Sequence, residues 1–213
     1  MGAGRRPALF LWEGKAVIKY YVTVLAVAAV TAVAVPIGAQ EDFDLEQEVT
    51  LCAGCHGESG IPVAPDYPII WGQEYFYILT QLRDYGAGRR QHEIMTGIAS
   101  KYSRKQATLL AEHFSKLAWP DVFNEAKEGD RETSEVASSA GQCNACHGRW
   151  GGNSNVPRVA GQQAGYLDKT MLDFKNEIRL NAPDKISTMS KFDDDTIAAL
   201  ARHLASVRLL SGQ

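Results

Sequence analysis

The chain has 213 residues, of which 45% are hydrophobic and 22% charged, a length that suits one medium domain or two small ones with packed cores. Its formal net charge of −3 offers no basic surface of the kind that binds nucleic acid, so we expect no nucleic-acid partner. Residues 1–39 are basic on balance, and the remainder holds 18 basic and 24 acidic side chains, a formal charge of −6. Such an acidic body favours docking to a basic surface on a partner protein.

The N-terminal segment carries an export or anchoring pattern. Residues 20–35 contain no charge, four basic side chains precede them, and an acidic stretch begins after Gln40. A basic lead, an apolar run and small residues before a polar segment are typical of a signal peptide, here cleaved after Ala39. Residues 16–39 are also long enough to span a bilayer, which takes about 20 helical residues, so a retained inner-membrane anchor is the alternative. Both alternatives place the body in the periplasm.

The rest of the chain predicts helices and no strand. Apolar spacing predicts three main helices in each half, and no run alternates with period two. The expected ranges are 44–56, 73–86 and 104–117, then 132–147, 162–176 and 194–209. Ser103 and Asp193 are predicted N-caps, because their side chains can accept backbone N–H groups at a helix start.

A polar segment with Pro120 and Gly129 separates the two sets of helices and is the predicted linker. We therefore expect an N-terminal segment, two domains and a linker. Their predicted ranges are 1–39, 40–119, 120–130 and 131–213.

All four cysteines lie in two nearly identical stretches, CAGCHG at 52–57 and CNACHG at 143–148. Each reads C-x-x-C followed by His, the attachment pattern of c-type haem. Two thiols three positions apart can reach the two vinyl groups of one porphyrin, and the next residue can direct its imidazole to the iron. The sequence therefore predicts two covalently attached haem c groups. The residues expected to hold them are Cys52, Cys55 and His56, and Cys143, Cys146 and His147.

Two other cysteine chemistries fit less well. A zinc site built from two C-x-x-C pairs would have the pairs about 15–20 residues apart, whereas 87 residues lie between Cys55 and Cys143. A thioredoxin-like motif would need a βαβ setting, which the pattern does not predict.

The similarity between the halves extends beyond the cysteines. Residues 71–85 parallel residues 160–174 at an offset of 89, and residues 109–117 parallel 199–207 at an offset of 90. The chain is therefore a tandem duplication of a unit of about 90 residues.

Met95 and Met189 are the candidate second axial ligands of the two irons. Each is the one methionine between the second and third predicted helices of its unit, and a Met opposite a His raises a haem potential. Met171 falls inside a predicted helix and is expected to be core. The alternatives are that both methionines are loop hydrophobes, or that His92, three residues before Met95, is a ligand.

Four further residues recur in both halves. His113 and His203 match in the third helices and are expected to pack, either beside the haem or at a domain interface, and not to bind iron. Pro68 and Pro157 precede the second helices. Their carbonyls can accept the N–H of His56 and His147, which would orient the imidazoles; a helix-boundary proline is the plainer interpretation, and both can hold together.

The haem motifs, the PxxxGQ segments at 68–73 and 157–162 and the EIMTGIA segment at 93–99 resemble the dihaem cytochromes c of the c4 type, over about residues 44–210. The resemblance implies an all-α fold of two tandem class I cytochrome c domains related by pseudo-two-fold symmetry, with His/Met-ligated haems. It also implies a periplasmic carrier of single electrons. The stretch after Met189 is shorter than in the family, and the histidines of the third helices replace an aromatic residue.

Family resemblance further implies redox protein partners: a bc1-type complex, a terminal oxidase or a dehydrogenase. The chain also resembles the cytochrome subunit of flavocytochrome c sulfide dehydrogenase, so an electron-accepting subunit of a periplasmic dehydrogenase is the alternative function. A dihaem enzyme is a third hypothesis, but it would need an open iron and a generally longer chain. We therefore expect an electron carrier without catalytic residues.

Overall fold

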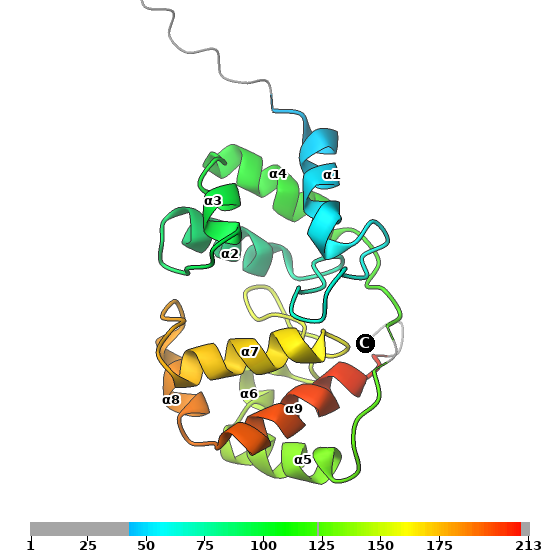
Figure 1. Ribbon diagram of the computed structural model, residues 1–213, viewed down its shortest axis with the longest axis vertical. Helices are drawn as coiled ribbons and strands as arrows, with labels where there is room; N and C mark the ends of the chain where they lie inside the picture. The colour runs from blue at the N-terminus through cyan, green and yellow to red at the C-terminus, as the bar shows by residue number, and fades with distance from the viewer. Residues whose placement is uncertain (1–42, 123, 210–213) are drawn as a thin grey trace, which may run out of the picture. The chain divides into compact units, whose positions relative to one another are not determined.

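The structure is a computed structural model that describes residues 43–122 and 124–209 (Figure 1). The segment predicted to be a signal or anchor, residues 1–39, lies outside the described residues. No helix in the described part of the chain has the length and apolarity needed to cross a membrane. We refer to residues 43–122 as the first half and to residues 124–209 as the second half.

Helices dominate both halves, and the all-α prediction is confirmed: in residues 43–122 and 124–209 the only β pairing is an isolated bridge between Asn153 and Val156. The first half contains α1 (Leu45–His56), α2 (Tyr75–Gly86), α3 (Met95–Ala99) and α4 (Arg104–Ser115). The second half contains α5 (Asp130–Ala140), α6 (Asn144–His147), α7 (Ala164–Lys175), α8 (Pro183–Met189) and α9 (Asp194–Ser206).

The predicted N-caps start their helices as expected. Ser103 forms a capping box with Gln106 at the start of α4: the Gln106 N–H donates to Ser103 Oγ at 3.4 Å, and the Ser103 N–H donates to Gln106 Oε1 at 2.7 Å. At the start of α9, the Thr196 N–H donates to Asp193 Oδ1 at 2.8 Å. Because these bonds join residues only three positions apart, both helix starts could be predicted from the sequence.

The continuous helix predicted over 132–147 is wrong. The chain forms α5 and α6 separately, with a turn between them in which Gln142 has a φ of 52°. Gly141 follows the last residue of α5 with a helical φ of −84°, and the left-handed conformation of the next residue, Gln142, ends the helix. Met95 and Met189 lie in two further short helices, α3 and α8, which the sequence did not predict.

Helix packing brings equivalent elements together in each half. In the first half α2 packs on α3 and α4, and α1 packs on α4. In the second half α7 packs on α8 and α9, and α9 packs on α5 (Figure 1). The buried centres are apolar, with Leu110 and Phe114 of α4 in one and Ile197 and Leu200 of α9 in the other. In both halves the short helix that carries the candidate methionine, α3 or α8, therefore packs on the equivalent longer helix, α2 or α7.

Candidate cofactor site

A continuous cavity of about 490 Å³ lies between the helices, within the size range of cofactor sites. Side chains from both halves line it. The lining includes every predicted haem residue and both candidate methionines: Cys52, Cys55, His56, Met95, Cys143, Cys146, His147 and Met189. Residues that are 91 positions apart in the sequence therefore border one space.

The first histidine is held in the tautomer that a metal ligand needs. His56 ends α1 and is buried, and its Nδ1 lies 2.8 Å from the carbonyl oxygen of Pro68. A proline carbonyl can only accept, so Nδ1 carries the proton and the Nε2 lone pair is left for a metal. Burial lowers the pKa of His56, although the Pro68 bond opposes the shift, so the imidazole is neutral at pH 7.

The second histidine repeats this arrangement. His147 ends α6, and its Nδ1 lies 3.2 Å from the carbonyl oxygen of Pro157. Burial again lowers the pKa of the imidazole. The two prolines considered as acceptors in the sequence thus lie beside their histidines in both halves.

None of the four cysteines forms a disulfide. Cys52 and Cys55 lie in α1, three positions apart, so both side chains project from nearly the same side of the helix toward the cavity. Burial raises the pKa of the Cys52 thiol to about 11, and a nearby Glu48 adds to the shift. Among the described residues, no three His, Cys, Asp or Glu side chains group as a metal ion would require.

Both candidate methionines border the cavity, but from opposite ends of their short helices. Met95 begins α3, and Met189 ends α8, where it is 7% exposed and packs in the core of the second half. Met171 of α7 belongs to the same core and borders the cavity as well, but its equivalent in the first half is a leucine, Leu82.

His92 is poorly arranged to bind iron. Its Nδ1 accepts the backbone N–H groups of Ile94 at 3.2 Å and Met95 at 3.4 Å. Because those groups can only donate, the proton of the neutral ring lies on Nε2, which then has no lone pair for a metal. His113 and His203 do not line the cavity, and the ring of His113 meets Phe114 edge-on.

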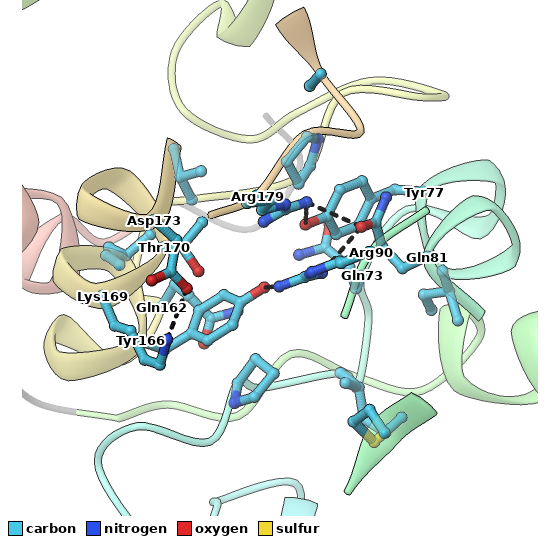
Figure 2. A pocket seen from close by; sticks show the side chains of 18 of the residues that line it. Gln73, Tyr77, Gln81, Arg90, Gln162, Tyr166, Lys169, Thr170, Asp173 and Arg179 are labelled. Carbon is cyan, nitrogen blue, oxygen red and sulfur yellow. Dashed lines mark hydrogen bonds and ion pairs between the residues drawn. The ribbon is translucent and has the colours of Figure 1, made fainter. Parts of the chain in front are cut away.

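Two arginines that the motif analysis missed project into the cavity (Figure 2). Arg90 and Arg179 are 8% and 6% exposed, and each donates to a tyrosine of the other half: Arg90 Nη2 to Tyr166 Oη at 3.2 Å, and Arg179 Nη2 to Tyr77 Oη at 3.4 Å. Both also donate to Gln81 Oε1, at 2.9 Å and 2.8 Å. A signal existed in the sequence, since the arginines repeat at the same offset of 89 as the tyrosines.

These arginines make the cavity electropositive. Within residues 43–122 and 124–209 neither guanidinium forms a salt bridge; each lies instead over an aromatic ring, Arg90 over Tyr85 and Arg179 over Phe174. Burial by itself would raise the pKa of Tyr166, but the charges of Arg90 and Arg179 outweigh it and lower this pKa. Burying an unpaired charge costs several kcal/mol, so the site favours a ligand that brings anionic groups.

The residues present therefore fit haem c. Thiols at the right spacing can form the thioethers, two neutral imidazoles present Nε2, thioethers of methionine are available, and buried guanidiniums complement the propionate carboxylates of the porphyrin.

No family model matches the chain. Cytochrome c4 of Azotobacter vinelandii is 29% identical over 208 residues, covering 87% of this chain and 97% of that protein. The thiosulfate dehydrogenase electron acceptor of Thiomonas intermedia is 32% identical over 147 residues, covering 64% of this chain and 68% of that protein. The crystal structure of reduced recombinant cytochrome c4 from Pseudomonas stutzeri superposes with a TM-score of 0.69 at 26% identity, covering 77% of this chain and 97% of that one.

Proposed function

The chain belongs to the cytochrome c4 family of dihaem c-type cytochromes, and from this premise we propose which residues hold its two covalently bound haem c groups and where it works. Cys52 and Cys55 would hold the first haem covalently, and His56 and Met95 would bind its iron. In the other half, the second haem would be held by Cys143, Cys146, His147 and Met189.

One observation carries this assignment: a single cavity is bordered by both sets, and in both the histidine Nδ1 is engaged by a proline carbonyl. When bound, the haem irons supply one-electron Fe(III)/Fe(II) chemistry. The chain orients each imidazole through Pro68 or Pro157 and offers two buried guanidiniums, Arg90 and Arg179, to the propionates.

We propose 40–119 and 131–213 as the two haem-binding domains, joined by 120–130. The absence of a helix in the described residues between Ser115 and Asp130 supports this division. Two haems in one chain allow an electron to enter at one domain and leave from the other.

Transfer of single electrons between proteins is the function of this dihaem cytochrome, and we propose respiratory partners in the periplasm: a bc1-type complex, a terminal oxidase or a dehydrogenase. The similarity to a protein named as a thiosulfate dehydrogenase electron acceptor supports a dehydrogenase as one donor. The formal charge of −6 outside residues 1–39 supports docking to a basic partner surface.

Export to the periplasm is proposed from residues 1–39, either as a cleaved signal or, through residues 16–39, as an inner-membrane anchor. Cell fractionation and N-terminal sequencing distinguish these arrangements. A mature chain that starts at Gln40 indicates a signal, and an intact N-terminus in the membrane fraction indicates an anchor. Haem-free protein in the cytoplasm as the normal product would contradict both.

Visible and near-infrared spectra of both redox states test the ligand assignment. We expect two low-spin irons with methionine-to-iron charge-transfer absorption in the oxidised protein, and a mass that keeps two haems after acid–acetone extraction. A high-spin iron that binds peroxide would favour a dihaem enzyme instead.

A further inference from the structure

Two buried glutamines cross between the halves in a reciprocal pattern. Gln162 of the second half binds both backbone groups of Ile69 in the first: the Ile69 N–H donates to Gln162 Oε1 at 2.7 Å, and Gln162 Nε2 donates to the Ile69 carbonyl at 2.9 Å. Gln73 of the first half does the same to Arg158 in the second, at 2.8 Å and 3.0 Å. Both glutamines border the cavity (Figure 2).

The orientation of each side-chain amide is determined by its partners. Gln162 and Gln73 are 2% and 4% exposed. Each Oε1 also accepts the N–H of the next residue in its own half, Gln163 or Glu74, at 2.9 Å. Backbone N–H groups only donate and carbonyls only accept, so a flipped amide would lose every one of these bonds.

The bonded residue in each case follows the proline that holds a histidine. The N–H of Ile69 and the C=O of Pro68 belong to one peptide unit, which is planar and conjugated. That unit donates to Gln162 Oε1 at 2.7 Å and accepts from His56 Nδ1 at 2.8 Å. The peptide between Pro157 and Arg158 likewise links Gln73, at 2.8 Å, to His147 Nδ1, at 3.2 Å.

We propose that Gln162 and Gln73 are positioning residues that tune the axial histidine of the haem in the opposite half. The inference rests on the proposed function, in which His56 and His147 bind iron. Hydrogen bonds in a chain polarise one another. An acceptor on the N–H side of a peptide therefore makes its carbonyl a stronger acceptor for the histidine Nδ1–H.

A stronger bond at Nδ1 makes the imidazole a more basic ligand. A more basic imidazole stabilises Fe(III) over Fe(II), which lowers the potential of that haem. Each half thus adjusts the potential of the other half's haem through one glutamine, which bonds to the peptide that in turn bonds to the histidine.

Single substitutions in the full chain with both haems attached test this crossed pattern. Gln162→Leu removes the acceptor from the peptide after Pro68, so we expect the potential of the first haem to rise while that of the second is unchanged. Gln73→Leu should raise the potential of the second haem only. The matched control is Gln163→Leu, one position along, whose side chain forms no helix-capping hydrogen bond; it should leave both potentials unchanged.

Potentials of the individual haems are read from an NMR redox titration, because each haem gives its own shifted methyl resonances. Met95→His and Met189→His each alter one haem and so assign the signals. Gln162→Glu, whose protonated carboxyl can still accept the Ile69 N–H and donate to the Ile69 carbonyl, should leave the first haem close to its wild-type potential. If Gln162→Leu does not fold, Gln73→Leu tests the same crossed pattern on the second haem.

Three results would overturn the proposal: a shift in the potential of the haem in the substituted residue's own half, equal shifts in the potentials of both haems, or no shift in potential in a folded variant. A failure of the proposed function looks different. If wild-type protein lacks low-spin His/Met haems, or Met95→His changes neither haem, the ligand assignment itself falls, and this inference falls with it. If both irons have His/Met ligands but a glutamine substitution does not shift the potential of the opposite haem alone, only the inference about the glutamines is rejected.

Discussion

At the scale of single residues, the histidines and methionines differ in what holds them in place. Each histidine follows a cysteine in a helix and is oriented by a proline carbonyl, 2.8 Å away for His56 and 3.2 Å away for His147. Each methionine sits at one end of a short helix, with Met95 half-buried and Met189 buried. The methionines lie outside the C-x-x-C-H motifs that attach the haems. Replacing a methionine therefore tests its effect on the haem potential with the least disturbance of haem attachment.

Met95→His should keep the haem attached and lower the potential of the first haem. A thioether favours Fe(II) more than an imidazole does. We expect a shift on the order of 0.1 V, within the ~0.8 V range that axial ligands set. A spectroelectrochemical titration measures it.

The matched control is Met171→Leu in α7, a volume-conserving change in the core that should cost less than about 1.5 kcal/mol of stability and leave both potentials close to wild type. Unchanged potentials in Met95→His, or a large shift in Met171→Leu, would contradict the ligand assignment.

At the scale of helices, an ion pair ties α5 to α9. Asp130 begins α5 with its side chain 5% exposed, and it accepts from Arg202 Nε at 2.8 Å and Nη2 at 2.6 Å. Its Oδ2 also accepts the Lys127 N–H at 2.7 Å. The bonds from Arg202 lower the pKa of Asp130 despite its burial. This geometry is bidentate and therefore more specific than a surface ion pair.

Asp130→Asn should reduce the free energy of unfolding by about 1–3 kcal/mol, because hydrogen bonds to a charged group are lost. Chemical denaturation followed by circular dichroism measures the change. Glu135→Gln breaks an exposed ion pair with Arg131 on the same helix and should have little effect. Equal effects of the two substitutions would show that the burial and bidentate geometry of the Asp130–Arg202 pair add nothing to the free energy of unfolding.

The same pair predicts a pH dependence. A carboxylate whose pKa is lowered on folding contributes stability above its unfolded pKa of about 3.9, and that contribution is lost as the pH falls through the lowered value. The stability difference between wild type and Asp130→Asn should therefore be full above about pH 4 and shrink at lower pH.

At the scale of the whole molecule, the halves meet through backbone groups as well as side chains. The Tyr166 N–H, in the first turn of α7, donates to the Pro65 carbonyl oxygen at 3.0 Å. Gly165 precedes it, and a Cβ at that position would lie 2.8 Å from the same oxygen. The close approach of the two halves at this point thus needs a residue without a side chain.

Gly165→Ala should destabilise the protein by about 1–3 kcal/mol, since backbone atoms of the two halves would have to move apart. Gly97→Ala in α3 is the matched control, because nothing lies within 4 Å of its Cβ position and alanine favours a helix by up to about 1 kcal/mol. Denaturant unfolding of both variants checks the prediction. A stabilised Gly165→Ala would show that the halves are not held at this distance.

Much of the site was predictable because its signals are local. Each C-x-x-C-H motif and each N-cap, at Ser103 and Asp193, is contained in a short stretch of sequence. The repeat appears when two such stretches are compared at offsets of 89 and 90. The break between α5 and α6 was missed, because the helical pattern in the sequence continues across Gly141. Nothing in that pattern shows that Gln142 adopts a left-handed conformation.

By itself, then, the sequence determined the helical class, the duplicated unit and the two haem motifs, since each follows from side chains close together along the chain. Only the tertiary structure decided which nitrogen of His56, His92 and His147 carries the proton, because that depends on what lies beside the ring. It also paired each half's glutamine and arginine with the other half, across 76 to 102 positions of sequence, a separation over which no local pattern specifies a contact.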